Sequence, residues 1–304
     1  MNKSLKFFLV IIAIFALRVI LTPPLNQVLH PYFKFEKIFD RLVMVFAVAA
    51  AFFFVILPKL NRKESFFEPA LWREYGFDFS KPWQRLIVSG FLAGAGTVLI
   101  LALIEGSFGP RYFRHPILVQ DVLQRFFKGL LTGLVVGTVE EFFFRGFIFT
   151  HLAKKINIWI SVLMTSAFYS TCHFFDTGNV FIPHDHPSIR ESLLLLVSHL
   201  EPITHRPLEI LPEFTGLFLL GLLLNLAFIR TRSIFLSIGV HAGAVFLVKF
   251  QHSFIRSDLT AYHPLFGSTP YYDGPVEWAV LCLLGICIWW MSGVIASEAK
   301  QSKI

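Results

Sequence analysis

Charged residues are scarce in this chain of 304 residues. They make up 15% of the sequence, where a soluble protein carries roughly 25%, and 55% of the residues are hydrophobic. The apolar residues form long blocks instead of alternating with polar ones. This combination excludes an ordinary soluble domain and indicates an all-α polytopic protein embedded in a lipid bilayer. The net charge of +7 therefore indicates loops that face anionic headgroups, and no nucleic-acid partner.

Cysteine is also scarce, and a signal-peptide cleavage site is missing. Cys172, Cys282 and Cys287 lie in apolar segments, and their odd number and spacing give no disulfide framework, so we expect them to be packing residues.

The N-terminus resembles a signal peptide, with two lysines before an apolar stretch that begins at Phe7. However, no small-x-small pattern follows and the apolar run continues to Leu21, which predicts an uncleaved first span.

Seven further apolar stretches are long enough, or nearly so, to cross a bilayer as helices. They cover residues 42–58, 87–105, 129–150, 157–175, 214–229, 234–250 and 277–296. We therefore predict about eight transmembrane helices in a single transmembrane domain, residues 1–304. The connection 176–213 is expected to be an extramembrane loop with one short interfacial or re-entrant helix, because its apolar run Leu193–Val197 is too short to span.

Basic residues in the shortest connections set the predicted orientation. Lys154, Lys155, Arg230 and Arg232 lie in short turns on the side that the span count assigns to both termini. By the positive-inside rule, this favours cytoplasmic N- and C-termini. We expect a multi-pass protein of a bacterial inner membrane.

Two adjacent glutamates, Glu140 and Glu141, lie inside the predicted span 129–150. An ionised carboxylate is costly in hydrocarbon, so acidic residues in a span indicate a functional site that faces the bundle interior. Glu141 and Arg145 are one helical turn apart and share a face, so they can form an ion pair. Glu140 has no such partner in its own helix, which favours it as a general base or acid.

Two other predicted spans each carry a histidine. His173 shares a helix face with Tyr169, and His241 shares one with Ser237. Small residues that let helices approach closely recur at four-residue spacing: Gly133 and Gly137 before Glu141, and Gly239 and Gly243 around His241. Two intramembrane histidines in a chain with intramembrane glutamates favour a joint chemical role.

These residues resemble three motifs of the CAAX prenyl protease and bacteriocin-processing family, also called CPBP or Abi. The motifs are Glu140-Glu141-x-x-x-Arg145, Tyr169-x-x-x-His173 and Ser237-Ile-Gly-Val-His241, within a CPBP-like core of about 125–250. The resemblance implies an eight-helix intramembrane protease of the glutamic type that cleaves a membrane-proximal or C-terminal segment of a membrane-associated protein or peptide. It further implies that Glu140 activates a water, that His173 helps to hold this water and that His241 stabilises the oxyanion. Glu141, Arg145 and Tyr169 would orient the site.

The chain departs from the family pattern at two positions. The family usually has Phe where this chain has Tyr169, and it usually has Asn one turn after the third-motif histidine, where this chain has Val245. An Asn there would be a second donor to the oxyanion, and losing one such donor typically costs on the order of 100- to 1000-fold in rate. Asn225 and Ser237 are candidates to replace it.

No cofactor is expected. Glu140, His173 and His241 together form a set that could bind catalytic zinc, but they come from separate helices without a His-x-x-x-His pair, and the family is treated as metal-independent. We therefore predict no metal. The string His184-Asp185-His186 could also ligate a metal, but a solvated loop is favoured.

Three alternatives remain open at this point. A proton-coupled transporter could use Glu140 and Glu141 as a relay, although the sequence lacks the internal repeats that such folds often show. A catalytically silent membrane scaffold would fit Val245. A thiol protease built on Cys172 is disfavoured, because Cys172 and His173 are adjacent and point in different directions on a helix.

Overall fold

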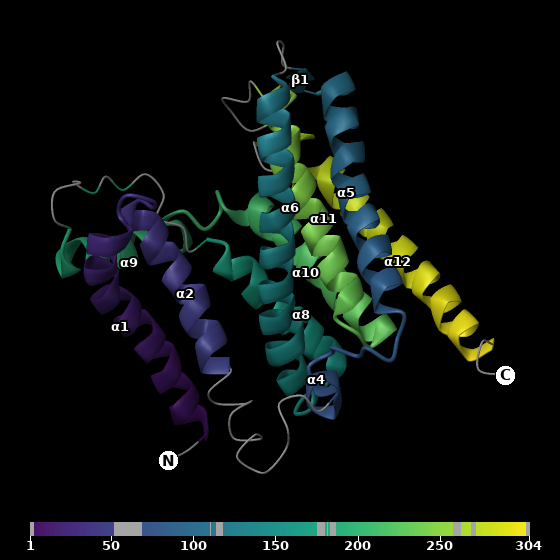
Figure 1. The fold of residues 1–304 in the computed structure, drawn as a ribbon, viewed down its shortest axis with the longest axis horizontal. Helices are drawn as coiled ribbons and strands as arrows, with labels where there is room; N and C mark the ends of the chain where they lie inside the picture. Colours follow the sequence, from purple (N-terminus) through teal and green to yellow (C-terminus); the bar gives the residue numbers. More distant parts are fainter. Residues whose placement is uncertain are drawn as a thin grey trace. The chain divides into compact units, whose positions relative to one another are not determined.

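The computed structural model describes residues 3–51, 69–109, 111–113, 118–174, 180, 182, 187–257, 263–268 and 272–301. Most residues in this part of the chain are helical, which confirms the predicted all-α membrane bundle (Figure 1). Among the described residues, four helices are long and apolar enough to cross a bilayer: Ile12–Leu29, Trp83–Phe108, Val119–Ala153 and Leu211–Thr231. Three shorter apolar helices cover Ile158–Cys172, Phe235–Gln251 and Pro275–Trp290. The chain is an integral membrane protein.

The elements follow one another along the chain with few strands. The helices are α1 Lys3–Leu29, α2 Phe35–Ala51, α4 Pro69–Glu74, α5 Trp83–Phe108, α6 Val119–Glu141, the π-helix η2 Phe142–Phe149, α7 Thr150–Ala153, α8 Ile158–Cys172, α9 Ile189–His205, α10 Leu211–Thr231, α11 Phe235–Gln251 and α12 Pro275–Gln301. The strands are β1 Arg111–Phe113 and β2 Ile255–Ser257, which pair antiparallel.

The predicted spans correspond to these helices, with differences at two spans and at the short helix predicted between two others. The span 42–58 begins in α2 and continues beyond the described residues. The helix that carries the two glutamates begins at Val119, before the predicted residue 129, because helical hydrogen bonding continues past the apolar stretch that marks the bilayer. The short helix predicted around Leu193–Val197 is the longer α9, which begins at a capping box formed by Ser188 and Glu191.

The described helices gather into two compact units. One contains α1, α2 and α9, and the other contains α4 to α8 and α10 to α12, with the boundary after Ser170 in the last turn of α8. The prediction of a single transmembrane domain stays a prediction. Glu140, Glu141, Arg145, Tyr169 and His241 belong to the second unit, whereas His173 belongs to the first.

The first unit is held together by charged groups that the sequence did not single out. Arg18 of α1 is buried, with its guanidinium 3.6 Å above the ring of Phe39 and 2.8 Å from Nδ1 of His199 on α9. Asp40 of α2 lies 3.8 Å from Arg18 and 3.3 Å from His199. A cation, an anion and an imidazole from three helices therefore lie within ion-pair distance of one another, as expected for charges that are buried.

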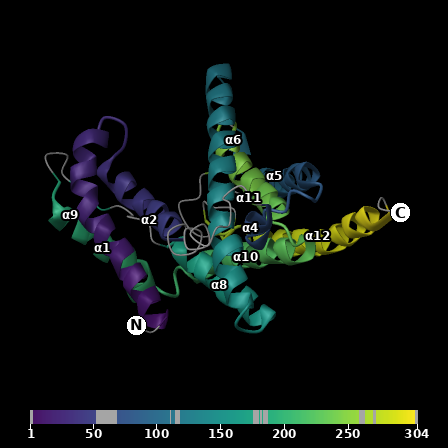
Figure 2. The same ribbon diagram turned by 60° about the horizontal axis from the view of Figure 1, so that its bottom comes forward.

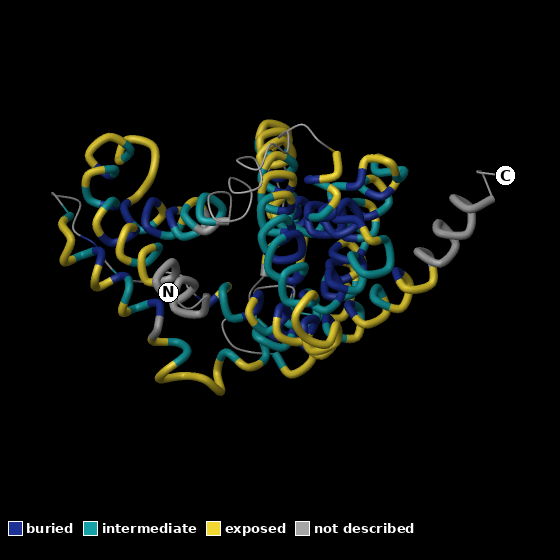
Figure 3. The backbone as a smooth tube through the Cα atoms, turned by 90° about the horizontal axis from the view of Figure 1, so that it is seen from below, coloured by how far each residue is buried: buried dark blue, intermediate teal, exposed yellow. Residues whose placement is uncertain are grey.

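In the second unit, α11 lies between α5 and α6 (Figures 1 and 2). Glycines of α6 face the backbone of α11: a Cβ added to Gly133 would overlap the carbonyl oxygen of Ala242, and one on Gly137 would lie 3.2 Å from the Ala242 Cβ. On the other side of α11, a Cβ on Gly243 would overlap the Phe91 carbonyl of α5. The predicted small-residue stripes thus let α11 approach both neighbours at backbone distance. Figure 3 shows buried positions gathered in the interior of this unit.

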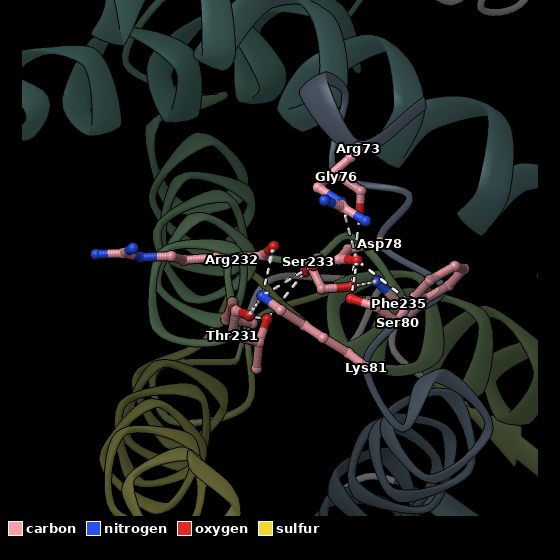
Figure 4. A network of polar contacts seen from close by, with 10 residues as sticks. Arg73, Gly76, Asp78, Ser80, Lys81, Thr231, Arg232, Ser233 and Phe235 are labelled. Carbon is pink, nitrogen blue, oxygen red and sulfur yellow. Dashed lines mark hydrogen bonds and ion pairs between the residues drawn. The ribbon is translucent and has the colours of Figure 1, made fainter. Parts of the chain in front are cut away.

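A polar network fixes the turn from which α11 begins (Figure 4). The carbonyl of Gly76, in the loop between α4 and α5, accepts a hydrogen bond from the backbone N–H of Ile234 at 2.9 Å. Lys81 of the same loop donates to the carbonyls of Thr231 and Arg232, and its Nζ also lies 3.7 Å from Asp78. These bonds connect the α4–α5 loop to the α10–α11 turn, and so set where α11 starts.

We predict that Gly133→Leu forces α11 away from α6 and lowers the thermal unfolding midpoint, because overfilling a tightly packed interface costs about 1–3 kcal/mol or more. Thermal unfolding of the purified protein in detergent measures this effect. The matched control is Gly96→Leu in α5, because a Cβ at Gly96 meets nothing within 4 Å. Equal thermal midpoints for the two variants would show that the α6–α11 interface accommodates a leucine side chain at position 133.

Asp78 gives a pH-dependent prediction. Partial desolvation alone would raise the pKa of Asp78, but hydrogen bonds from Ser80 and the charges of Lys81 and Arg73 outweigh it and lower that pKa. A carboxylate with a lowered pKa in the folded state stabilises the fold above its unfolded pKa of about 3.9, and this stabilisation is lost as the pH falls through the folded pKa.

We therefore expect Asp78→Asn to lower the thermal midpoint at pH 7 and to flatten the decline of the midpoint below about pH 4. Thermal scans between neutral and acidic pH measure both effects. The control is Glu209→Gln, which removes an exposed carboxylate from α9's C-terminal flank. A midpoint-versus-pH curve for Asp78→Asn identical to that of the unsubstituted protein would rule out this contribution.

Candidate functional site

The two glutamates lie where α6 changes into the π-helix η2. Glu141 is the last residue of α6, and Phe142 begins a π-helical segment that ends at Phe149. A π-helix is rare and is found mostly as a short segment at functional sites. The winding of this long helix therefore changes directly after its two acidic residues.

Glu141 is sealed inside the bundle. Its side chain has no exposed surface, and Nη1 of Arg145 donates a hydrogen bond to its Oε1 at 2.9 Å. The same oxygen lies 2.9 Å from Nδ1 of His241 on α11. The ion pair predicted from the helix periodicity is therefore present, and a histidine from another helix joins it.

Arg145 connects three parts of the second unit. It is fully buried, and besides its bond to Glu141 it donates from Nη2 to the carbonyl oxygen of Gly221 on α10 at 3.1 Å. Its guanidinium lies 4.9 Å from the ring centroid of Tyr169 on α8, within the range of a cation–π contact. A planar guanidinium suits this role because it can donate hydrogen bonds in its plane and, at the same time, stack on the face of an aromatic ring.

Glu140 has a different environment from its neighbour. Its side chain is 18% exposed, and its ion-pair partner among the described residues is His241, with Nε2 3.9 Å from Oε2 of Glu140. This distance is longer than a hydrogen bond. In the described part of the chain, Oε2 is buried without a hydrogen-bond partner. Because Glu141 has no exposed surface, Glu140 is the one of the two carboxylates that an additional molecule can approach.

His241 lies between the two carboxylates, with one ring nitrogen directed to each. An ionised carboxylate can only accept hydrogen bonds, so the proton between His241 and Glu141 is assigned to Nδ1. This assignment leaves Nε2 on the side of Glu140. Glu141 therefore fixes the orientation of the imidazole ring, as a carboxylate does for histidine in hydrolytic sites.

The two remaining site residues predicted from the sequence, Tyr169 and His173, belong to different units of the structure. Tyr169 is almost fully buried, and its ring meets that of His241 edge-on at 6.1 Å between centroids. His173 follows the end of α8 and belongs to the first unit, so its predicted help to Glu140 stays a prediction. The Gly221 carbonyl was not predicted as a partner of Arg145, because a backbone acceptor has no side-chain signature in the sequence.

The cofactor prediction is not decided by the structure. Among the described residues, no group of three or more His, Cys, Asp or Glu side chains could hold a metal ion. His184, Asp185 and His186 lie outside the described residues. That the site works without zinc or another cofactor stays a prediction.

Comparison with known proteins identifies the segment that carries this site. Residues 122–247 match the family model described as type II CAAX prenyl endopeptidase Rce1-like. The matched segment begins in α6 and ends in α11, so it includes all of the side chains described above. Neither a curated protein nor a solved structure matches the chain.

Removing Arg145 tests whether this buried pair holds the site together. Arg145→Met removes the guanidinium from the buried Glu141, and the loss of one partner of a buried pair typically costs about 3–5 kcal/mol. We expect a large fall in the thermal midpoint of the purified protein. The control is Arg190→Met, at an exposed position in the first turn of α9. A midpoint for Arg145→Met equal to that of the control would mean that the pair does not stabilise the fold.

Proposed function

We propose that this chain, whose residues 122–247 match the type II CAAX prenyl endopeptidase family model, is a glutamic-type intramembrane endopeptidase. Its substrate would be a membrane-proximal or C-terminal segment of a membrane-associated protein or peptide. In this proposal Glu140 activates the attacking water, His241 stabilises the oxyanion, and Glu141 and Arg145 hold His241 in place.

The proposal rests on the difference in exposure and in bonding between the two glutamates. Glu141 is sealed and bound to both Arg145 and His241, which suits a positioning role. Glu140 is 18% exposed, whereas Glu141 has no exposed surface, so a water and a substrate can reach the side chain of Glu140. A general base must lie within hydrogen-bond reach of the proton it removes, and of the two carboxylates only Glu140 meets this condition.

The charges around the site support the proposed chemistry. Two carboxylates, Glu140 and Glu141, face one guanidinium and one imidazole, so the group is neutral when His241 is an imidazolium. In that form, Nδ1–H donates to Glu141 while Nε2–H is a preplaced donor on the side of Glu140. A charged donor fixed in a buried site is the feature that most strongly stabilises a developing oxyanion.

The proposed reaction follows from these positions. Glu140 accepts a proton from water while the water oxygen bonds to the scissile carbonyl carbon, and the π electrons of the carbonyl move to its oxygen. The Nε2–H of His241 donates to that oxyanion. When the tetrahedral intermediate collapses, the C–N bond breaks and Glu140 returns its proton to the leaving nitrogen, which regenerates the carboxylate. By its family resemblance, His173 would help to hold the water.

The two neighbouring glutamates provide a matched test. Glu140→Gln keeps the size of the side chain but cannot accept the proton, so we expect cleavage to fall by at least about 100-fold with an unchanged thermal midpoint. Glu141→Gln weakens the buried bonds to Arg145 and His241, so we expect a lower midpoint as well as slower cleavage. The assay follows an internally quenched peptide that ends in a farnesylated CAAX sequence, in detergent or nanodiscs.

Two controls define the outcome. Glu209→Gln, at an exposed position, should leave both cleavage and midpoint unchanged, and an unprenylated peptide shows whether the lipid is required. Undiminished cleavage by folded Glu140→Gln would exclude the proposed base. If the unsubstituted protein cleaves neither peptide, the proteolytic function itself is wrong for this chain.

A further inference from the structure

Basic side chains gather at the end of the second unit where α6 begins, α11 ends and β1 lies (Figure 1). The two helices are in contact there. The rings of Phe126 and Phe250 lie 5.6 Å apart, and a Cβ added to Gly129 would lie 3.5 Å from the Cβ of Lys249. Exposed basic residues at or close to these contacts form what we call the cationic patch: Arg125, Lys128, Lys249, His252 and Arg256.

The members of the cationic patch act on one another electrostatically. His252 lies directly after α11, in the turn that leads into β2. Partial desolvation lowers the pKa of His252, and the positive charges of its neighbours lower it further; these neighbours are Arg125, Arg111, Lys249 and Arg256. They come from α6, β1, α11 and β2, so the positive charges of four elements converge on one imidazole.

Acidic side chains do not neutralise this patch. Glu105 of α5 pairs with Arg111 of β1, which lies outside the patch. On α6 the nearest acidic residue is Asp121, one turn before Arg125, and among the described residues these two form no ion pair. Like charges on α6 and α11 therefore repel each other across the contact that brings His241 to Glu141. An anion bound between the helices would attract both sides.

An apolar surface adjoins the patch. The ring of Phe126 lies 5.3 Å from that of Phe246 on α11, and Phe126 and Phe127 are 37% and 64% exposed. The predicted spans 129–150 and 234–250 both end at the patch. The cations therefore lie where lipid headgroups are expected, and the phenylalanines lie where the hydrocarbon begins. A ligand that fits both parts has a negatively charged head and an apolar chain.

The distance to the proposed active site excludes the substrate's terminal carboxylate as this ligand. Arg125 and Glu140 are 15 residues apart in α6, which is about 22 Å at 1.5 Å per residue. An extended chain needs about seven residues to cover that length. A CAAX sequence ends three residues after its cysteine, so a CAAX carboxylate held at the patch would leave the cysteine far from Glu140.

We propose that the cationic patch binds the headgroup of an anionic phospholipid from the surrounding bilayer. Its phosphate would lie between Arg125 and Lys128 on one side and Lys249, His252 and Arg256 on the other, with an acyl chain along the exposed phenylalanines of α6. The bound lipid would hold α6 against α11. This inference goes beyond the proposed endopeptidase function and does not depend on it.

Lipid titration of the purified full-length protein in a neutral detergent tests the proposal. Phosphatidylglycerol is compared with zwitterionic phosphatidylcholine of the same acyl chains, and bound lipid is counted by native mass spectrometry. We expect phosphatidylglycerol to bind at least about tenfold more tightly and to raise the thermal midpoint, because each Lys or Arg near anionic lipid contributes about fivefold in affinity.

A charge-matched pair of variants assigns this preference to the patch. Arg125→Gln/Arg256→Gln removes one cation from α6 and one from β2, so we expect the affinity for phosphatidylglycerol to fall by about 25-fold, with that for phosphatidylcholine unchanged. The control, Arg85→Gln/Lys155→Gln, removes two exposed cations where α5 begins and after α7, at the other end of the unit. It should keep the affinity for phosphatidylglycerol within threefold.

Several results would overturn the proposal. Equal affinities for the two lipids show that the patch does not select an anionic headgroup, and this comparison needs no variant. Equal losses in the two double variants show that binding follows net charge and not the patch. If inorganic phosphate or a farnesylated CAAX peptide displaces phosphatidylglycerol at an equal concentration, the patch binds a free anion or the substrate instead. Cleavage is not measured, so these results are independent of the endopeptidase function.

Discussion

The site depends on the close approach of α11 to α6. Glycines at positions 133 and 137 let the backbone of α11 lie directly against α6, and this proximity brings Nδ1 of His241 to 2.9 Å from Glu141. In hydrocarbon, apolar side chains gain little by leaving lipid, so van der Waals packing and interhelical hydrogen bonds must hold helices together. The glycine contact provides the van der Waals packing, and the Glu141–His241 contact provides the interhelical hydrogen bond.

The buried charges form one connected group in which each residue supports another. Glu141 balances Arg145, Arg145 binds α10 through the carbonyl of Gly221 and stacks on Tyr169, and His241 lies between the two carboxylates. This network leaves one acidic group, that of Glu140, only loosely paired and partly accessible. Two adjacent residues of one helix therefore have different roles: the buried Glu141 stabilises the bundle, and the partly exposed Glu140 is available to react.

The sequence predicted those features that lie within one helix. The Glu141–Arg145 pair follows from helical periodicity, and the glycine stripes follow from their spacing. Contacts between helices were less predictable: periodicity does not show that the hydrogen bond of His241 is to Glu141, or that its other ring nitrogen lies 3.9 Å from Glu140. Which carboxylate it meets depends on the rotation and register of α6 against α11, and periodicity within either helix does not determine these. The π-helix and the Arg18–His199 contact likewise depend on tertiary packing.

The central claim is that Glu141 acts through His241, and a double-mutant cycle on cleavage tests it most directly. The cycle compares kcat/KM for the unsubstituted protein, Glu141→Gln, His241→Ala and the double variant, each confirmed to be folded. If Glu141 works by orienting His241, its substitution has no further effect once the imidazole is gone, so the double variant should cleave as fast as His241→Ala. Fully additive losses would contradict the account, because they would mean that the two residues act independently.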